Sequence, residues 1–226
     1  MADLEYLYAV VDRLPRRWRA PGRGVAGTLV SARRVEDVVA VFSRLIALPP
    51  RTLAALGQHE DVVGALLEAD ALVPLGFGMA VADADAWVRS RLGLLHEALD
   101  RLRGSVEMRV RLLSLDPGLP ERGLAEIAER VMQSAGLPPA RCQARRRTLD
   151  TELAFLVPRN QVDAFLTRLA PVAARAAGVA VVPAGPAPPY HFAPAFGLPQ
   201  RAGPEYPLRH AWSFACLGSL STRSSA

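Results

Sequence analysis

The second half of the chain switches between two hydrophobic periods, one typical of strands and one typical of helices. Residues 105–113 alternate strictly, because Val106, Met108 and Val110 face one way and charged residues face the other. The predicted order is strand 105–113, helix 119–135, strands 140–147 and 151–157, helix 161–177 and strand 179–182. This is the β-α-β-β-α-β order of a ferredoxin-like domain, in which right-handed crossovers place both helices on one sheet face.

The first half is less regular but also mixes strands and helices. Residues 4–11 are β-branched and aromatic and predict a strand, and residues 25–31 predict a second one. The stretch 35–46 fits the helical period and the strand composition equally well, so its structure stays open. Further along, the pattern predicts a helix over 52–69 that Thr52 caps, a strand pair or a strand with a glycine hinge over 71–81, and a helix from Asp83 or Asp85 to Arg103.

These patterns predict an α+β protein of two domains and a proline-rich tail. Residues 1–103 form an N-terminal mixed α/β domain, and residues 104–183 form a C-terminal, modified ferredoxin-like (βαββαβ) domain. Prolines recur too often over 184–226 for a helix or a central strand. We expect this tail to pack extended on the surface, with its last residues disordered.

One face of the predicted C-terminal sheet is strongly basic. Turned away from the helices are Glu107, Arg109, Arg111, Arg141, Arg145 and Arg147. RNA-recognition modules share this strand order, but they stack bases on aromatic side chains of the two central strands, which here offer only Phe155. Nucleic acid is therefore not the favoured partner, although an RNA-binding or other protein-binding module that uses this open face stays as the alternative.

Composition and charge narrow the class of protein. Half of the 226 residues are apolar, which supports a core without disulfides or metals, and the net charge of +5 is a weak argument for nucleic acid. Cys142 and Cys216 lie far apart, and no CxxC spacing occurs. Neither a signal peptide nor a membrane-spanning stretch is present, so we expect the cytoplasm as the location and no membrane partner.

The sequence predicts neither an enzyme nor a cofactor or metal site. Residues 22–27 match GxGxxG, but they follow a proline-containing loop and precede a strand-like stretch, which favours a plain loop over a dinucleotide site. His191 and His210 lack obvious carboxylate partners beyond Glu205, which disfavours a metal site. No pair of carboxylates stands out for acid–base chemistry.

Six blocks in order make the chain resemble the gas vesicle protein F/L family. They are YLYAVV at the front, HEDVVGALL (59–67), LVPLGFGMAV (72–81), GSVEMRVRLL (104–113), LAFLVPRNQVDAFL (153–166) and GPAPPYHF (185–192). The chain departs from the family pattern at Gly76, Met79 and Ala187, where that pattern has arginine, threonine and tryptophan.

The resemblance implies a non-enzymatic structural or assembly protein of gas vesicles. It implies binding to the hydrophobic shell protein and to other gas vesicle proteins, and a location in the cytoplasm and at the gas vesicle. Candidate residues for contact with a partner or between domains are Phe77, Arg109, Arg111, Arg145, Arg147, Pro188, Pro189, Tyr190 and Phe192. Because aromatics beside prolines usually pack, contact between domains is the favoured role of the last four.

Overall fold

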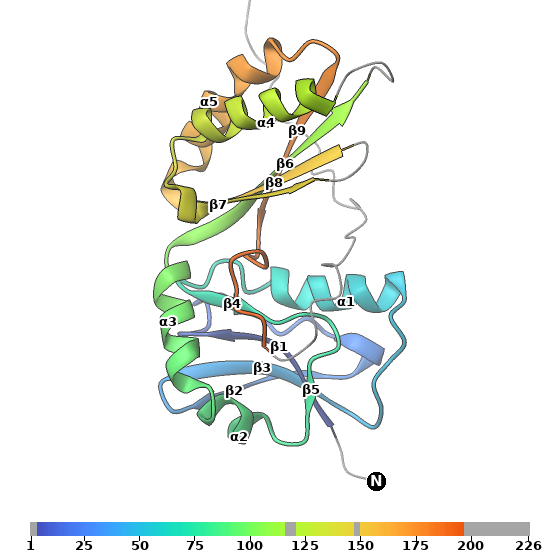
Figure 1. Ribbon diagram of the computed structural model, residues 1–226. Helices are drawn as coiled ribbons and strands as arrows, with labels where there is room; N and C mark the ends of the chain where they lie inside the picture. Colours follow the sequence, from blue (N-terminus) through green and yellow to red (C-terminus); the bar gives the residue numbers. More distant parts are fainter. Residues whose placement is uncertain (1–3, 116–120, 147–149, 197–226) are drawn as a thin grey trace, which may run out of the picture.

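The chain has an α+β fold built on two antiparallel sheets. The computed structural model describes residues 4–115, 121–146 and 150–196. Figure 1 shows the two sheets as a lower, N-terminal part and an upper, C-terminal part. We call residues 4–104 the N-terminal part and residues 105–187 the C-terminal part. Arg147 and the predicted disordered end of the tail lie outside the described residues.

The N-terminal sheet has the order β2-β3-β1-β4, and β5 also pairs with β1. Its strands are β1 (Leu4–Val11), β2 (Val30–Val35), β3 (Val38–Leu45), β4 (Leu72–Pro74) and β5 (Ala80–Val81). The predicted strand at 4–11 is therefore confirmed. Residues 71–81 hold two short strands, each of which pairs with β1 rather than with the other. The ambiguous stretch 35–46 contains β3.

Helices cover both faces of this sheet, which explains why its strands are apolar on both sides. Tyr6 and Tyr8 pack with α1 (Leu53–Gly64), whereas Leu7 and Val10 pack with α2 (Ala84–Arg89) and α3 (Leu92–Leu102). Strands buried on both faces read as continuous apolar runs. The valines of 35–46 form such a run, so the helical period there was misleading.

Two predictions for the N-terminal part are wrong in detail. Residues 25–27 form a 3-10 turn rather than the start of a strand, because Ala26 and Gly27 have φ values of 56° and 71°. The predicted helix to Arg103 is two helices, α2 and α3. The Ser90 hydroxyl donates to the Trp87 carbonyl at 2.8 Å where the first of them ends.

The C-terminal sheet has the order β7-β8-β6-β9, and every neighbouring pair is antiparallel. Its strands are β6 (Ser105–Ser114), β7 (Cys142–Arg146), β8 (Asp150–Pro158) and β9 (Val179–Ala187). The helices α4 (Glu121–Ala135) and α5 (Val162–Ala174) pack on one face, against Val110, Phe155 and Val157.

Strand β9 continues five residues beyond the predicted end at residue 182, to Ala187. It contains Pro183 and Pro186, which an edge strand tolerates because one side of its backbone is unpaired. The predicted tail at 184 therefore begins inside the sheet.

The two parts meet where the chain passes from α3 to β6. The amide of Gly104 donates to the Asp70 carbonyl at 2.6 Å, and the amide of Arg159 donates to the Gly104 carbonyl at 2.9 Å. The Arg159 guanidinium also donates to the Ala69 carbonyl at 2.8 Å. Ala154 and Leu156 of β8 belong to the same apolar cluster as α2 and α3, so one core spans both parts.

Candidate functional site: a strap between the two sheets

Residues 188–196, which we call the strap, leave β9 and return to the N-terminal sheet. Figure 1 shows this orange-red segment descending from the upper part to the N-terminal sheet, past β4 and toward β1. Its backbone forms a tight turn, because the amides of Phe192 and Ala193 donate to the Pro189 carbonyl at 3.1 and 3.0 Å. Three consecutive side chains of this turn, Tyr190, His191 and Phe192, bind in different places.

Tyr190 contacts a buried histidine of the N-terminal part. The Nε2 atom of His59 lies 3.0 Å from the Leu75 carbonyl oxygen and 3.1 Å from the Tyr190 hydroxyl. A carbonyl only accepts, so Nε2 carries the proton. Nδ1 then accepts, and it lies 2.9 Å from the Tyr6 hydroxyl, which donates to it.

The surroundings of His59 keep it uncharged. It is only 1% exposed, and the rings of Tyr6 and Phe77 lie edge-on 5.7 and 5.9 Å from its centre. Burial lowers the pKa of His59 to about 4, because a charged imidazole has no water to solvate it there. The Tyr6 hydroxyl also accepts from the amide of Gly78 at 3.1 Å, which ties the β4–β5 loop to this site.

His191 points to the C-terminal part, where it contacts a buried carboxylate. Glu107 is fully buried, and its Oε1 accepts from His191 Nδ1 at 2.8 Å and from Arg109 Nε at 2.6 Å. Its Oε2 accepts from the backbone amide of His191 at 2.9 Å. Burial raises the pKa of Glu107, but the hydrogen bonds from His191 and the charge of Arg109 outweigh it, so the pKa lies below its usual value.

The backbone of the strap is held by side chains from both parts. Gln143 of β7 donates to the His191 carbonyl at 2.7 Å, and Arg101 of α3 donates to the Phe192 carbonyl at 2.9 Å. Just before the strap, Gly185 has a φ of 121°, and a Cβ there would lie 2.8 Å from the Glu107 carbonyl oxygen. Glycine is therefore required where β9 crosses the start of β6.

The basic face of the C-terminal sheet is less open and less basic than predicted. Glu107 is buried under the strap, and Arg109 pairs with it. Arg111 pairs with Asp150 at 2.8 Å. Arg145 is half-buried and lies opposite Glu152 on β8. Carboxylates from the same sheet therefore neutralise much of the charge that the sequence places on this face.

The other candidate residues gather around the strap. Pro189 and Phe192 are buried. Phe196, which the sequence analysis did not single out, is also buried and lies edge-on to Trp87 with ring centres 5.3 Å apart. Phe77, Pro188 and Tyr190 are half-buried. Phe77 and Tyr190 pack against the α1-side cluster, whereas Phe192 packs against the cluster of α2 and α3.

Sequence reasoning missed the two polar residues that receive the strap. His59 follows a helical pattern and gave no sign of burial, and strand alternation placed Glu107 on the basic face without showing what covers it. His191 was considered only as a metal ligand. The signal that was present is GPAPPYHF itself, which carries Tyr190, His191 and Phe192 in one block.

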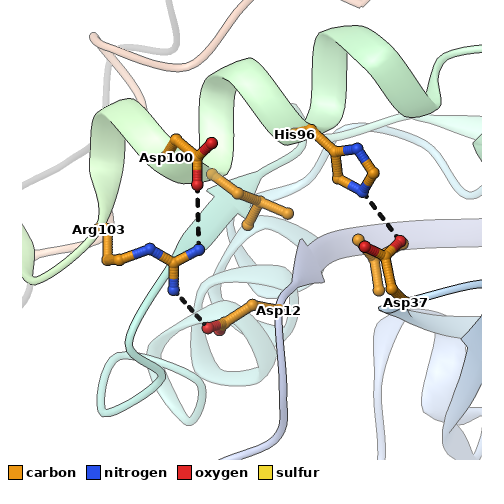
Figure 2. Close-up of a pocket in the computed structure, with 7 residues that line it drawn as sticks. Asp12, Asp37, His96, Asp100 and Arg103 are labelled. Atoms are coloured by element: carbon orange, nitrogen blue, oxygen red, sulfur yellow. Dashed lines mark hydrogen bonds and ion pairs between the residues drawn. The ribbon is translucent and has the colours of Figure 1, made fainter.

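A surface pocket of about 300 Å³ lies beside α3 (Figure 2). Its charged residues bind one another: Arg103 contacts Asp12 at 2.8 Å and Asp100 at 3.2 Å, and His96 contacts Asp37 at 2.9 Å. The hydrogen bond from His96 lowers the pKa of Asp37. These pairs fasten α3 to β1 and to the β2–β3 turn.

The described residues contain no cluster of three histidine, cysteine or acidic side chains that could hold a metal ion. Within the same residues, no helix has the length and apolarity that crossing a membrane requires. Burial raises the pKa of the Cys142 thiol, which weakens it as a nucleophile.

The sequence model of one protein family, described as "Gas vesicle synthesis protein GvpL/GvpF", matches residues 4–150 and 121–194. These ranges include both sheets and most of the strap. The chain belongs to the GvpL/GvpF family. The resemblance seen in the sequence is thereby confirmed, and no curated protein is similar enough in sequence to count as a relative.

Two crystal structures of gas vesicle protein GvpF share the fold. The protein from Anabaena sp. PCC7120 matches with a TM-score of 0.70 and 16% identity, over 86% of this chain and 97% of that one. The protein from Microcystis aeruginosa matches with a TM-score of 0.68 and 14% identity, over 85% of this chain and 99% of that one. Both cover the two-sheet architecture of the GvpL/GvpF fold.

Proposed function

We propose that this GvpL/GvpF chain is a non-enzymatic assembly protein that binds the hydrophobic shell protein while a gas vesicle forms. The protein then acts in the cytoplasm and at the growing vesicle. The family match supports a role in gas vesicle synthesis. A shell protein with a large apolar surface aggregates unless a partner covers that surface, and a protein that binds it there prevents the aggregation.

The observation that carries the proposal is how the strap uses the buried polar groups. Tyr190 bonds to the N-terminal part and His191 to the C-terminal part, while Phe192 enters their shared core. These contacts support a rigid scaffold whose buried groups bind one another rather than a partner. A rigid scaffold binds with little loss of conformational entropy, so we assign partner binding to the outer surface.

The same proposal includes the domain division. Residues 1–103 and 104–183 are two domains, and the second is a modified ferredoxin-like domain. The element order β6-α4-β7-β8-α5-β9 and the strand order β7-β8-β6-β9 support this assignment. Pro188, Pro189, Tyr190, Phe192 and Phe77 then act as contacts between domains rather than with a partner.

The RNA alternative receives no support from the C-terminal sheet. Arg109 and Arg111 pair with Glu107 and Asp150, so these two arginines already have carboxylate partners. A phosphate backbone would have to compete with both pairs. Among the described residues of this face, no aromatic side chain offers the platform that single-stranded RNA uses.

Co-expression with a gas vesicle shell protein tests the proposal. We expect the full chain to raise the share of shell protein in the soluble fraction and to be recovered with it by affinity capture. An unrelated soluble protein of similar size, expressed at the same level, is the control. If the shell protein precipitates equally with either one, the proposed function is wrong.

A further inference from the structure

Four large apolar side chains are exposed at one end of the N-terminal sheet. Leu29 is 77% exposed, Ile46 70%, Leu48 52% and Leu53 60%. They come from the residue before β2, from the loop after β3 and from the first turn of α1, and Figure 1 shows these three places at the same end of the sheet. We call these four residues the apolar end.

The strand register agrees with this grouping. Val30 pairs with Ser43 and Leu45 with Leu4, so Leu29 and Ile46 lie at the same end of the sheet, where β2 begins and β3 ends. The described residues contain seven exposed large apolar side chains, and the other three are scattered. They are Leu94 on α3, and Leu115 and Val182 in the C-terminal part. Grouped exposed apolar residues mark interaction sites, whereas scattered ones do not.

Arginines surround the apolar end. Between residues 38 and 58 the only charged side chains are those of Arg44 and Arg51, and both are exposed. Arg44 lies 3.8 Å from the mostly buried carboxylate of Glu5. Arg23 lies next to the turn before β2, because its Nη1 is 3.7 Å from where a Cβ of Gly27 would lie. Three exposed arginines, Arg23, Arg44 and Arg51, therefore flank the apolar end with positive charge.

We propose that the apolar end binds an amphipathic helix whose apolar stripe is flanked by aspartate or glutamate. The inference rests on the proposed function, since it assigns this helix to the shell protein. Apolar anchors within a rim of one charge fit a helix that carries the opposite charge beside its stripe. Pro49 and Pro50 stiffen the loop that presents Ile46 and Leu48, which lowers the entropic cost of binding.

Two synthetic peptides test the chemistry of this surface. Both are helices of about 18 residues with the same leucine stripe, and one has glutamate and the other lysine beside the stripe. In fluorescence anisotropy with the full chain, we expect the glutamate peptide to bind at least about tenfold more tightly than the lysine peptide. Equal affinity for the two peptides would overturn the proposal.

Two surface variants locate the binding. The triple-serine variant carries Leu29→Ser, Ile46→Ser and Leu48→Ser and should bind the glutamate peptide at least about tenfold more weakly. A second variant with Arg23→Glu and Arg51→Glu should prefer the lysine peptide. Because all these side chains are exposed, thermal unfolding should stay close to that of the wild type. Leu94→Ser with Leu115→Ser is the matched control and should bind normally.

Three further outcomes separate this inference from the proposed function. If wild type and triple-serine variant keep the shell protein equally soluble, the apolar end is not the binding surface, although the proposed function holds. If the wild type fails to do so, the proposed function is wrong, and the peptide titration still decides what this surface binds. Stronger binding to phosphatidylglycerol vesicles than to either peptide would assign it to a membrane and overturn the proposal.

Discussion

The two buried sites that receive the strap hold it by different electrostatics. At the N-terminal part, Tyr190 meets a neutral His59 among aromatic rings. At the C-terminal part, His191 meets a carboxylate, Glu107, that Arg109 also contacts. In the first site the buried histidine is uncharged, and in the second the buried carboxylate is paired with an arginine. Neighbouring strap residues thus face environments that respond differently to mutation and to pH.

The difference predicts which site is more sensitive to loss of a partner. A buried charge without its counter-charge is costly, whereas a neutral hydrogen bond contributes modestly. The C-terminal site should therefore dominate the stability of the strap at neutral pH, and the N-terminal site should dominate its response to mild acid. Four measurements test this comparison.

The largest expected effect is that of Glu107→Ala. It removes the carboxylate that accepts from His191 and Arg109, both of which are mostly buried. We expect a loss of about 3 kcal/mol in the free energy of unfolding, measured by urea titration at neutral pH. Glu97→Ala on the exposed side of α3 is the control and should change it by less than about 0.5 kcal/mol. A loss below about 1 kcal/mol for Glu107→Ala would mean that the charged site does not dominate.

The second effect is a pH dependence that His59 causes. The folded protein holds His59 neutral down to a pKa of about 4, whereas an unfolded histidine takes up its proton near the ordinary value of 6.5. The unfolded state therefore binds more protons between these values, and stability falls as pH falls through this window. We expect a loss of about 2 kcal/mol between about pH 7 and about pH 5.

The pH profile also separates the two sites. The pKa of Glu107 lies below its ordinary value of 4.5, so its contribution stays intact above that pH and is lost only in stronger acid. His59→Leu should remove most of the loss between about pH 7 and about pH 5. If the pH profile of His59→Leu matches that of the wild type, His59 does not cause the loss of stability in this window.

A third, smaller effect is expected for Tyr6→Phe. The Tyr6 hydroxyl is fully buried, donates to His59 and accepts from the amide of Gly78, so its removal leaves both without that partner. We expect a loss of about 1.5 kcal/mol in the free energy of unfolding. Hydrogen exchange at the Gly78 amide should rise in the same variant, and unchanged protection there would count against this role.

The smallest effect is expected for Tyr190→Phe. The Tyr190 hydroxyl is half-buried, and His59 Nε2 keeps the Leu75 carbonyl as its acceptor when that hydroxyl is gone. We expect a loss of about 0.5 kcal/mol, smaller than that of Tyr6→Phe. The same urea titration measures both, and a reversed order would show that the strap side of His59 carries more of the stability.

Periodicity predicted the elements well where one face of a strand is polar. Strand β6 follows its predicted span within a residue because charged residues alternate with Val106, Met108 and Val110. Strand β3 could not be assigned, since both of its faces are buried and its valines carry no alternation. The turn at 25–27 was missed because an alanine gives no sign of the left-handed conformation that Ala26 adopts, and the hydrogen bond from the neighbouring Val25 amide to the Tyr8 hydroxyl joins residues far apart in sequence.

The candidate site was predictable only in part. The block GPAPPYHF identified Tyr190 and Phe192, because prolines beside aromatics are typical of ordered, packed segments. Glu107 and His59 were not predictable as its partners, since each lies far from the strap in sequence. Such long-range polar pairs leave no local pattern along the chain.

The most direct test of the account compares two variants in one assay, the share of shell protein that stays soluble on co-expression. Tyr190→Phe alters the strap but leaves the outer surface intact, and the triple-serine variant alters the apolar end but leaves the strap intact. We predict that Tyr190→Phe keeps the shell protein soluble as the wild type does, whereas the triple-serine variant does not. Loss of solubility with Tyr190→Phe and its retention with the triple-serine variant would contradict the account and make the strap the partner-binding segment.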